Sequence, residues 1–325
     1  MSYKNIYILG VGGSGMSSIA KFLKQKGENV IGYDQRKSYV TNLLNQDGIK
    51  VVHTLDEITY KPDNVYIYSS AIPIESERFE AFYDKENVLS RPEYLKILSE
   101  HHKIIGITGT HGKTSTTALL SHIFHFNNLN VSYLYGGITT FNGIGGHYGD
   151  TDQPLILETD EAFNTFEKIK ISDLLVLNVD SDHLDYFKNL DNYKDAFYKV
   201  MKNVMDNLVV NNDDVNIKSM RELKNPVTYG EDISANFKVK SPGNFIYENN
   251  KYEIKSDIIG DHFKSNMLGA IILAFLNGIE IKDSLNAIES FAGVKRRIEL
   301  IGISKGVSIY DDYGHHPTEM EATIT

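Results

Sequence analysis

The 325-residue sequence predicts an α/β protein with a Rossmann-like N-terminal domain, a central P-loop-type ATPase domain and the start of a C-terminal domain. The main observation is that a buried-type strand runs into a glycine turn and a helix twice, at residues 5–23 and 103–126. Short apolar strands then alternate with helical periods, which is typical of parallel sheets. We place the domains at residues 1–99, 100–301 and 302–325, the last one truncated.

Composition limits the function classes. The chain has 33 basic and 43 acidic side chains, a net charge of −10 and no cysteine. This balance argues against a general nucleic-acid binder, and the missing thiols exclude disulfides and thiolate metal sites. No apolar run approaches the length of a membrane span, and the chain enters a strand directly after its start. We expect a soluble cytoplasmic protein, monomeric or homodimeric, that acts on small molecules and contacts neither nucleic acid nor membrane.

The first glycine turn, Gly10-Val-Gly-Gly-Ser-Gly15, follows a strand and opens a helix. The next strand ends in Asp34, where a dinucleotide fold would meet a ribose hydroxyl. Alone, this pattern indicates an NAD oxidoreductase, but the same geometry serves any diphosphate, including that of a UDP-sugar. A turn without ligand is the plainest alternative. The candidate contacts are Gly12, Gly13, Ser14, Gly15 and Asp34, with Ser69 and Ser70 at a later strand end.

The second glycine turn is Gly109-Thr-His-Gly-Lys-Thr114, between a strand at 103–108 and a helix at 114–126. Such a turn directs backbone N–H groups and the helix dipole at an anion, Lys113 adds a full charge, and Thr114 can ligate Mg²⁺. A strict P-loop would need glycine at Ile107, so the generic motif fails. The alternative is an ordinary turn with a surface lysine. The candidate nucleotide contacts are Gly109, Thr110, His111, Gly112, Lys113, Thr114 and Ser115.

Acidic residues follow two later strands. Glu158-Thr-Asp-Glu161 ends one strand, and Asp180-Ser-Asp-His-Leu-Asp185 follows the next. Clustered carboxylates at strand ends repel one another unless they hold a cation, so we expect a metal site that includes Glu158 and His183. A solvated His183 is the alternative. The basic pair Arg296-Arg297 suits phosphate or carboxylate capture, although such a pair is usually a solvated face.

The remaining elements are predicted from local pattern. Residues 139–151 are glycine-rich and polar, which predicts a mobile loop. The helix at 190–205 carries Tyr193 and other apolar residues at core spacing, so they are interpreted as packing residues. Alternation over 245–254 predicts a hairpin with Asn249 and Asn250 in its turn. Residues 306–319 predict a strand followed by a polar turn. The roughly 20 residues from there to the last residue of the sequence are too few to bury a core.

The motifs in this order resemble the Mur ligases, which join amino acids to the UDP-linked muramic acid precursor of bacterial cell walls. The resemblance covers the whole chain. Within the family, the sequence most resembles the members that use ATP and Mg²⁺ to join L-alanine to UDP-N-acetylmuramate in peptidoglycan biosynthesis. Alternatives are a ligase that recycles the murein tripeptide, or a non-catalytic UDP-sugar or nucleotide-binding module. The motifs are Gly10–Met16, Ser69–Ile72, Gly109–Thr114, Glu158–Glu161, Asp182-His183, Phe291–Arg297 and Asp311–Thr318.

The resemblance also implies residue roles. Lys113 would contact the ATP phosphates, Thr114 and Glu158 would ligate one Mg²⁺, and His183 would serve a second. Where the family usually has Gly-x-His-Asn-x-x-Asn, this chain has Phe263 in place of the first asparagine. We expect these 325 residues to bind both nucleotides without ligating alanine. The further residues implied are Asn266 at the adenine, Arg297 at the phosphates, and Asp312, Tyr313 and His315 at the hinge and amino-acid site.

Overall fold

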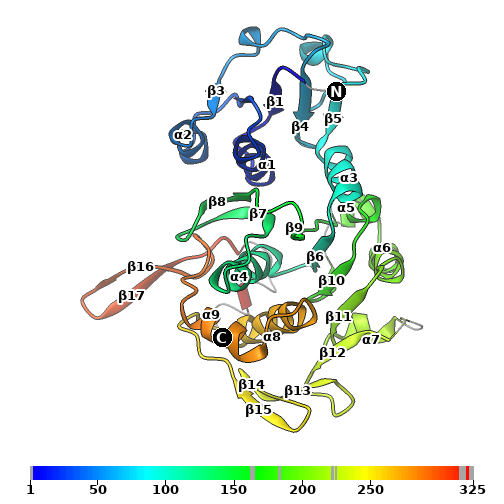
Figure 1. Cartoon of the computed structure of the whole chain (residues 1–325), viewed down its shortest axis with the longest axis vertical. Helices are drawn as coiled ribbons and strands as arrows, with labels where there is room; N and C mark the ends of the chain where they lie inside the picture. The colour runs from blue at the N-terminus through cyan, green and yellow to red at the C-terminus, as the bar shows by residue number, and fades with distance from the viewer. Residues whose placement is uncertain are drawn as a thin grey trace.

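The computed structural model describes residues 3–161, 165–181, 184–220, 223, 225–314 and 320–321. Its N-terminal part is a parallel sheet with strand order β3-β2-β1-β4-β5, and its helix α1 faces the rest of the molecule (Figure 1). All four strand pairings in it are parallel. The elements are β1 (Ile6–Leu9), α1 (Ser14–Gln25), β2 (Val30–Tyr33), α2 (Tyr39–Gln46), β3 (Lys50–Val52), β4 (Val65–Tyr68), β5 (Val88–Ser90) and α3 (Arg91–His101), with short 3₁₀ turns at Leu55–Glu57 and Glu77–Phe79.

Local sequence accounts for these helices. In α1, Met16, Ile19 and Leu23 recur at helical spacing and are buried. The helices α2 and α3 begin with capping boxes, in which Ser38 pairs with Thr41 and Ser90 pairs with Glu93. Because Ser90 is both the end of β5 and the cap of α3, the chain passes directly from the strand into this helix, which leads to the second sheet.

The second sheet has the order β15-β14-β13-β12-β11-β10-β6-β9-β7-β8. Its centre from β13 to β7 is parallel, and β8, β14 and β15 add antiparallel edges. The strands are β6 (Ile104–Thr108), β7 (Ser132–Thr139), β8 (Gly143–His147), β9 (Leu155–Glu158), β10 (Asp173–Val176), β11 (Asn207–Asn211), β12 (Val227–Gly230), β13 (Phe237–Ser241), β14 (Asn244–Tyr247) and β15 (Asn250–Glu253). The helices are α4 (Lys113–Phe126), α5 (Leu184–Phe187), α6 (Leu190–Lys202), α7 (Val215–Ser219), α8 (Asp261–Leu276) and α9 (Ile281–Glu289), with a 3₁₀ turn at Phe166–Lys168.

Apolar side chains form a core on each face of this sheet. Strand residues such as Ile105 and Ile107 pack with α4, α8 and α9, whereas the opposite face packs with α6. The second of these cores continues without a break into the N-terminal sheet, because Ile8 and Phe22 belong to the same buried cluster as Leu134. Since burial of apolar area is the main stabilising term, the two sheets form one packed body.

The prediction of a mobile loop at 139–151 is wrong. The structure has the strand β8 there, paired antiparallel with β7 and packed against α1. Its glycines allow this close approach: a Cβ on Gly146 would lie 2.0 Å from the Ser18 carbonyl oxygen, and one on Gly145 would lie 2.3 Å from the Tyr135 ring. The glycines therefore mark close packing rather than a loop.

A buried lysine crosses the same interface. Lys21 of α1 donates to the carbonyl oxygens of Asn142 and Ile144, the latter at 3.2 Å. Burial lowers the pKa of Lys21, with a smaller opposing effect from Asp47. The Tyr148 N–H also donates to Gln25 at 3.0 Å. Polar contacts thus fix α1 on β8 in addition to the apolar ones.

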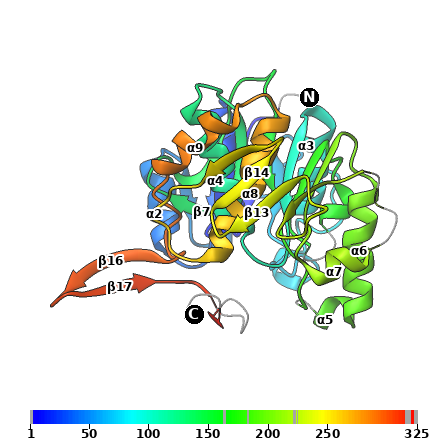
Figure 2. The same ribbon diagram turned by 90° about the horizontal axis from the view of Figure 1, so that it is seen from below.

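Two hairpins complete the described chain. The turn between β14 and β15 consists of Glu248 and Asn249, which both have positive φ, so it begins one residue earlier than the predicted Asn249–Asn250. A second hairpin, β16 (Glu299–Ser304) and β17 (Val307–Asp311), projects away from the body in both views (Figures 1 and 2). Among the described residues, none of the helices is long and apolar enough to cross a membrane.

Candidate functional site

The turn between β6 and α4 has the backbone of an anion-binding loop. Gly112 caps α4 with φ of +84° and Gly109 has φ of +142°, both in the region that favours glycine. A Cβ on Gly112 would lie 2.4 Å from the Asn266 amide nitrogen, so Asn266 of α8 lies directly against the turn. The first N–H groups of α4 therefore open onto the turn, where helix geometry leaves them without intrahelical partners.

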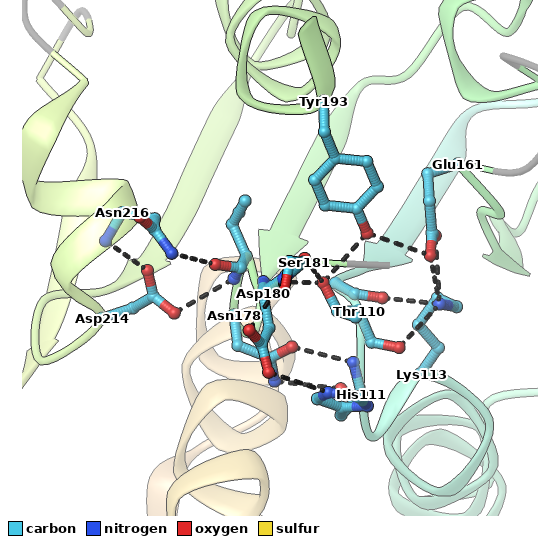
Figure 3. Close-up of polar contacts among 12 residues, drawn as sticks. Thr110, His111, Lys113, Glu161, Asn178, Asp180, Ser181, Tyr193, Asp214 and Asn216 are labelled. Atoms are coloured by element: carbon cyan, nitrogen blue, oxygen red, sulfur yellow. Dashed lines mark hydrogen bonds and ion pairs between the residues drawn. The ribbon is translucent and has the colours of Figure 1, made fainter. Parts of the chain in front are cut away.

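The segment after β10 holds this turn in place. The amide of Asn178 brackets His111, because its Oδ1 accepts from the His111 N–H at 2.8 Å and its Nδ2 donates to the His111 carbonyl at 3.0 Å. The Thr110 hydroxyl accepts from the Asp180 N–H at 2.8 Å, and His111 Nε2 lies 3.4 Å from Asp180 Oδ2. Figure 3 shows these contacts converging on Thr110 and His111. The loop shape is thus set by a neighbouring strand end.

Lys113 lies under the turn. Its Nζ donates to the carbonyls of Gly109 at 2.6 Å and Thr110 at 3.1 Å, and pairs with Glu161 at 3.0 Å (Figure 3). Tyr193 of α6 closes the network, since its hydroxyl lies 3.3 Å from Glu161 and 2.9 Å from Thr110 Oγ1. The Lys113 ammonium is therefore held at the turn from several sides.

The surrounding carboxylates favour the charged form of Lys113. Burial opposes the charge of Lys113, but Glu161, Asp160 and Glu158 outweigh it and raise the pKa of Lys113. Burial raises the pKa of Glu161, and Lys113 opposes that rise. Lys113 is a fixed cation at neutral pH, as a phosphate ligand needs.

Two candidate Mg²⁺ ligands face each other beside the turn. Thr114 Oγ1 donates to Glu158 Oε1 at 2.8 Å, and the Gly136 N–H donates to Glu158 Oε2 at 2.6 Å. Two oxygens bound at about 2.1 Å on adjacent octahedral positions lie roughly 3 Å apart, so this pair fits one Mg²⁺. Within the described ranges, no group of three or more His, Asp or Glu could hold a metal. Mg²⁺ needs few protein ligands, because water and phosphate oxygens complete its shell.

A cavity of about 460 Å³ opens beside the turn. It extends from His111 and Ser115 to Phe263 and Asn266 of α8 and to Asp214 at the start of α7. Asp214 is itself occupied, since it caps α7 and accepts from the Val179 N–H at 3.0 Å. The cavity combines apolar and amide-bearing walls, as expected of a site for a planar base.

The basic pair and the predicted hinge segment meet at the edge of this cavity. Arg297 and Asp312 both line it. Asp312 accepts from the Ile298 N–H at 2.8 Å, and the Tyr313 N–H donates to the Arg296 carbonyl at 2.8 Å. The Arg297 guanidinium lies 5.4 Å from the centre of the Tyr313 ring, a cation–π contact. His315 and His183 lie outside the described residues.

The first glycine turn has a different environment. The Gly12 N–H donates to Asp34 Oδ2 at 2.8 Å, and the Arg36 N–H donates to Asp34 Oδ1 at 2.9 Å. Ser69 lies close to Gly10 at the end of β4, and Ser70 follows it at the surface. Asp34 therefore stabilises the turn itself, and lone pairs remain on its oxygens for a ligand.

The two glycine turns lie close together. A Cβ on Gly136 would lie 3.1 Å from Ser14 Oγ and 3.5 Å from Glu158 Oε2. Gly136 thus separates the first turn of α1 from the carboxylate next to Thr114.

The sequence missed three residues of this site. The sequence predicts Asn178 as part of a buried strand and Tyr193 as a packing residue, but the Asn178 amide holds His111 and the Tyr193 hydroxyl joins the network. In the sequence Glu161 is one of three acids after a strand, whereas in the structure it is fully buried and pairs with Lys113. An amide inside an otherwise apolar run is the signal that could have identified Asn178.

Comparisons with known proteins agree with this architecture. Residues 107–274 match the family described as Mur ligase middle domain, and residues 5–103 match the Mur ligase family, catalytic domain. A UDP-N-acetylmuramate–L-alanine ligase from Caldicellulosiruptor saccharolyticus is 35% identical, over 98% of this chain and 73% of its own length. The corresponding ligase of Cytophaga hutchinsonii is 32% identical with the same coverage.

Solved structures give the same result. The crystal structure of UDP-N-acetylmuramate-alanine ligase MurC from Thermotoga maritima has a TM-score of 0.83 and 25% identity, and covers 98% of this chain and 76% of the other. A UDP-N-acetylmuramate:L-alanyl-γ-D-glutamyl-meso-diaminopimelate ligase from Neisseria meningitidis shares the fold, with a TM-score of 0.77 and 23% identity, and covers 90% of this chain and 100% of the other. The chain therefore belongs to the Mur ligase family.

Proposed function

We propose that this chain acts in the ATP-dependent ligation of L-alanine to UDP-N-acetylmuramate, within peptidoglycan precursor synthesis. The observation that carries the proposal is the meeting of two anion-binding turns at Gly136, beside Thr114 and Glu158. The names of the similar ligases support the substrates.

We assign ATP to the second sheet. Its phosphates would lie on Gly109–Thr114, where the Lys113 charge offsets theirs, and its base in the cavity lined by Phe263 and Asn266. Arg297 would reach the phosphates from the cavity edge. We place the domain boundaries at residues 99 and 301.

Mg²⁺ is proposed at Thr114 and Glu158, and a second ion at His183 by resemblance. Bound there, Mg²⁺ would neutralise charge on the transferring phosphoryl group. The 2.8 Å contact between Thr114 and Glu158 is the support for the first ion.

The UDP-sugar is assigned to the first sheet. Its diphosphate would lie on Gly12–Gly15, with Asp34, Ser69 and Ser70 around the nucleoside.

A carboxylate is a poor acylating agent, so the γ-phosphoryl group of ATP would first pass to the lactyl carboxylate. The alanine amine would then attack the acyl phosphate and release phosphate. Asp312, Tyr313 and His315 are proposed for the amine side.

The proposal is tested at Lys113. Lys113→Ala should abolish Mg²⁺-dependent ATP binding and leave UDP-N-acetylmuramate binding intact, both measured by titration calorimetry. Because the change removes the cation that pairs with the buried Glu161, at a cost of about 3–5 kcal/mol, the double variant Lys113→Gln/Glu161→Gln is titrated alongside. Lys202→Gln, exposed at the end of α6, is the charge control.

The outcomes separate the assignments. Equal loss of both ligands by the folded double variant would show that the two sites are not on separate sheets. Unchanged ATP affinity would mean that Gly109–Thr114 is an ordinary turn. The acceptor is tested by phosphate release in the natural gene product that contains these residues, and faster release with the murein tripeptide than with L-alanine would change the assignment.

A further inference from the structure

Arg91 occupies a junction between the two sheets. It is the first residue of α3, which starts directly after β5 and ends shortly before β6. The Ser90–Glu93 capping box and the neighbouring Pro92 fix the start of this helix. The Arg91 backbone is therefore a rigid base for its side chain.

The guanidinium lies on the first turn of α1. A Cβ on Gly15 would be 2.9 Å from Arg91 Nε and 3.1 Å from both Cζ and Nη2. Any side chain at position 15 would displace the guanidinium. Arg91 thus adds its charge at the helix start where Gly12–Gly15 are proposed to hold a diphosphate.

The other edge of the guanidinium points to the second sheet. Arg91 Nη1 lies 3.9 Å from Oδ2 of Asp160, which follows the strand end at Glu158. The two side chains are 21% and 33% exposed. Arg91 therefore spans the space between the first glycine turn and the acidic strand end.

This arrangement contributes little to stability. A partly exposed ion pair at that distance is worth about 0–1 kcal/mol, and a cation at a helix start opposes the helix dipole. Among the described residues, the buried Arg91 Nε has no hydrogen-bond partner. A buried donor left without a partner is costly, so stability does not explain this position. Nε is enclosed against Gly15, and the partly exposed side chain leaves the two Nη groups to bind a ligand.

We propose that Arg91 is a substrate-contacting residue that binds the diphosphate of the UDP-sugar on Gly12–Gly15 and, through Asp160, sets its position relative to the ATP site. The inference rests on the proposed function. A planar guanidinium matches phosphate oxygens in a bidentate manner, and Gly15 leaves it free to approach them. The diphosphate is favoured over the lactyl carboxylate because Gly15 belongs to the turn itself.

The test compares Arg91→Gln and Arg91→Lys with the unchanged chain. UDP, UDP-N-acetylglucosamine and UDP-N-acetylmuramate are each titrated, because only the last carries the lactyl carboxylate. Arg91→Gln should weaken all three by a similar factor, roughly tenfold to a hundredfold, as for a lost charge-assisted hydrogen bond. Arg91→Lys should recover part of the affinity, and ATP affinity should stay unchanged in both.

Lys96→Gln is the matched control, since it removes an exposed charge from the same helix and should change nothing. Loss confined to UDP-N-acetylmuramate would overturn the diphosphate assignment in favour of the carboxylate. Unchanged affinities, or equal loss of ATP and all uridine ligands, would show a structural role only. If the unchanged chain binds none of the uridine ligands, the proposed function itself fails.

Discussion

The Lys113–Glu161 pair illustrates how function is built at the residue scale. A buried lysine is stabilised here by a fully buried carboxylate, and the Tyr193 hydroxyl contacts that carboxylate and is itself held by the Thr110 hydroxyl. The lysine could be predicted from sequence because glycine spacing and chain order identify it. Its partners could not, since Glu161 follows β9 and Tyr193 lies in α6, and only the tertiary fold brings these separate segments to the turn.

The stability of the fold should depend on pH through His122. This buried ring of α4 contacts the Ala287 carbonyl at 3.1 Å and the Ser290 hydroxyl at 2.9 Å. Burial lowers the pKa of His122 below its usual 6.5, with a smaller opposing effect from Ala287. Between the two pKa values the unfolded chain binds a proton that the folded one excludes, so stability falls as the pH drops below about 6.5.

We expect the free energy of unfolding to fall less between pH 7.5 and 5.5 in His122→Gln than in the unchanged chain. Urea titrations at both pH values measure this difference. His101→Gln, which removes an exposed histidine at the end of α3, is the control and should change the pH dependence less than His122→Gln does. Identical pH dependence in His122→Gln and the unchanged chain would contradict the prediction.

At the scale of elements, the strands and helices of both sheets could largely be predicted, because their periods and caps are local. The region 139–151 could not. Its glycines are read locally as a loop, but in the fold they permit β8 to pack on α1. That contact joins residues more than a hundred positions apart, so no local pattern specifies it.

Gly146→Ala tests this packing. The added Cβ would lie 2.0 Å from the Ser18 carbonyl oxygen and 2.8 Å from the Ser18 carbonyl carbon, both backbone atoms that cannot turn away. The two elements must separate, so we expect a loss of at least about 1–3 kcal/mol in the free energy of unfolding. Gly302→Ala is the control, because nothing lies within 4 Å of its Cβ position. Similar stabilities of the two variants by urea denaturation would contradict the close packing.

At the scale of the whole molecule, the arrangement of the two sheets determines what the first one can bind. The turn at Gly10–Gly15 with Asp34 is also the pattern of a dinucleotide site, and sequence alone leaves both alternatives open. A dinucleotide fold needs a second mononucleotide-binding half next to the first. Here the first turn of α1 instead abuts Gly136 of β7, in the second sheet, and Arg91 at the start of α3, so these residues occupy the space beside it.

We therefore expect saturable binding of UDP-N-acetylmuramate and none of NAD or NADP. Calorimetry measures the first, and NADH fluorescence with a known dehydrogenase as positive control measures the second. Gly12→Ala locates the site, because its Cβ would lie 2.7 Å from Asp34 Oδ2 and should displace the carboxylate that holds the turn. Loss of UDP-sugar affinity in this variant, with ATP affinity kept, would assign the ligand to the turn. NADH binding that Gly12→Ala also removes would instead mean that the turn is a dinucleotide site and that the second sheet leaves room for the nicotinamide.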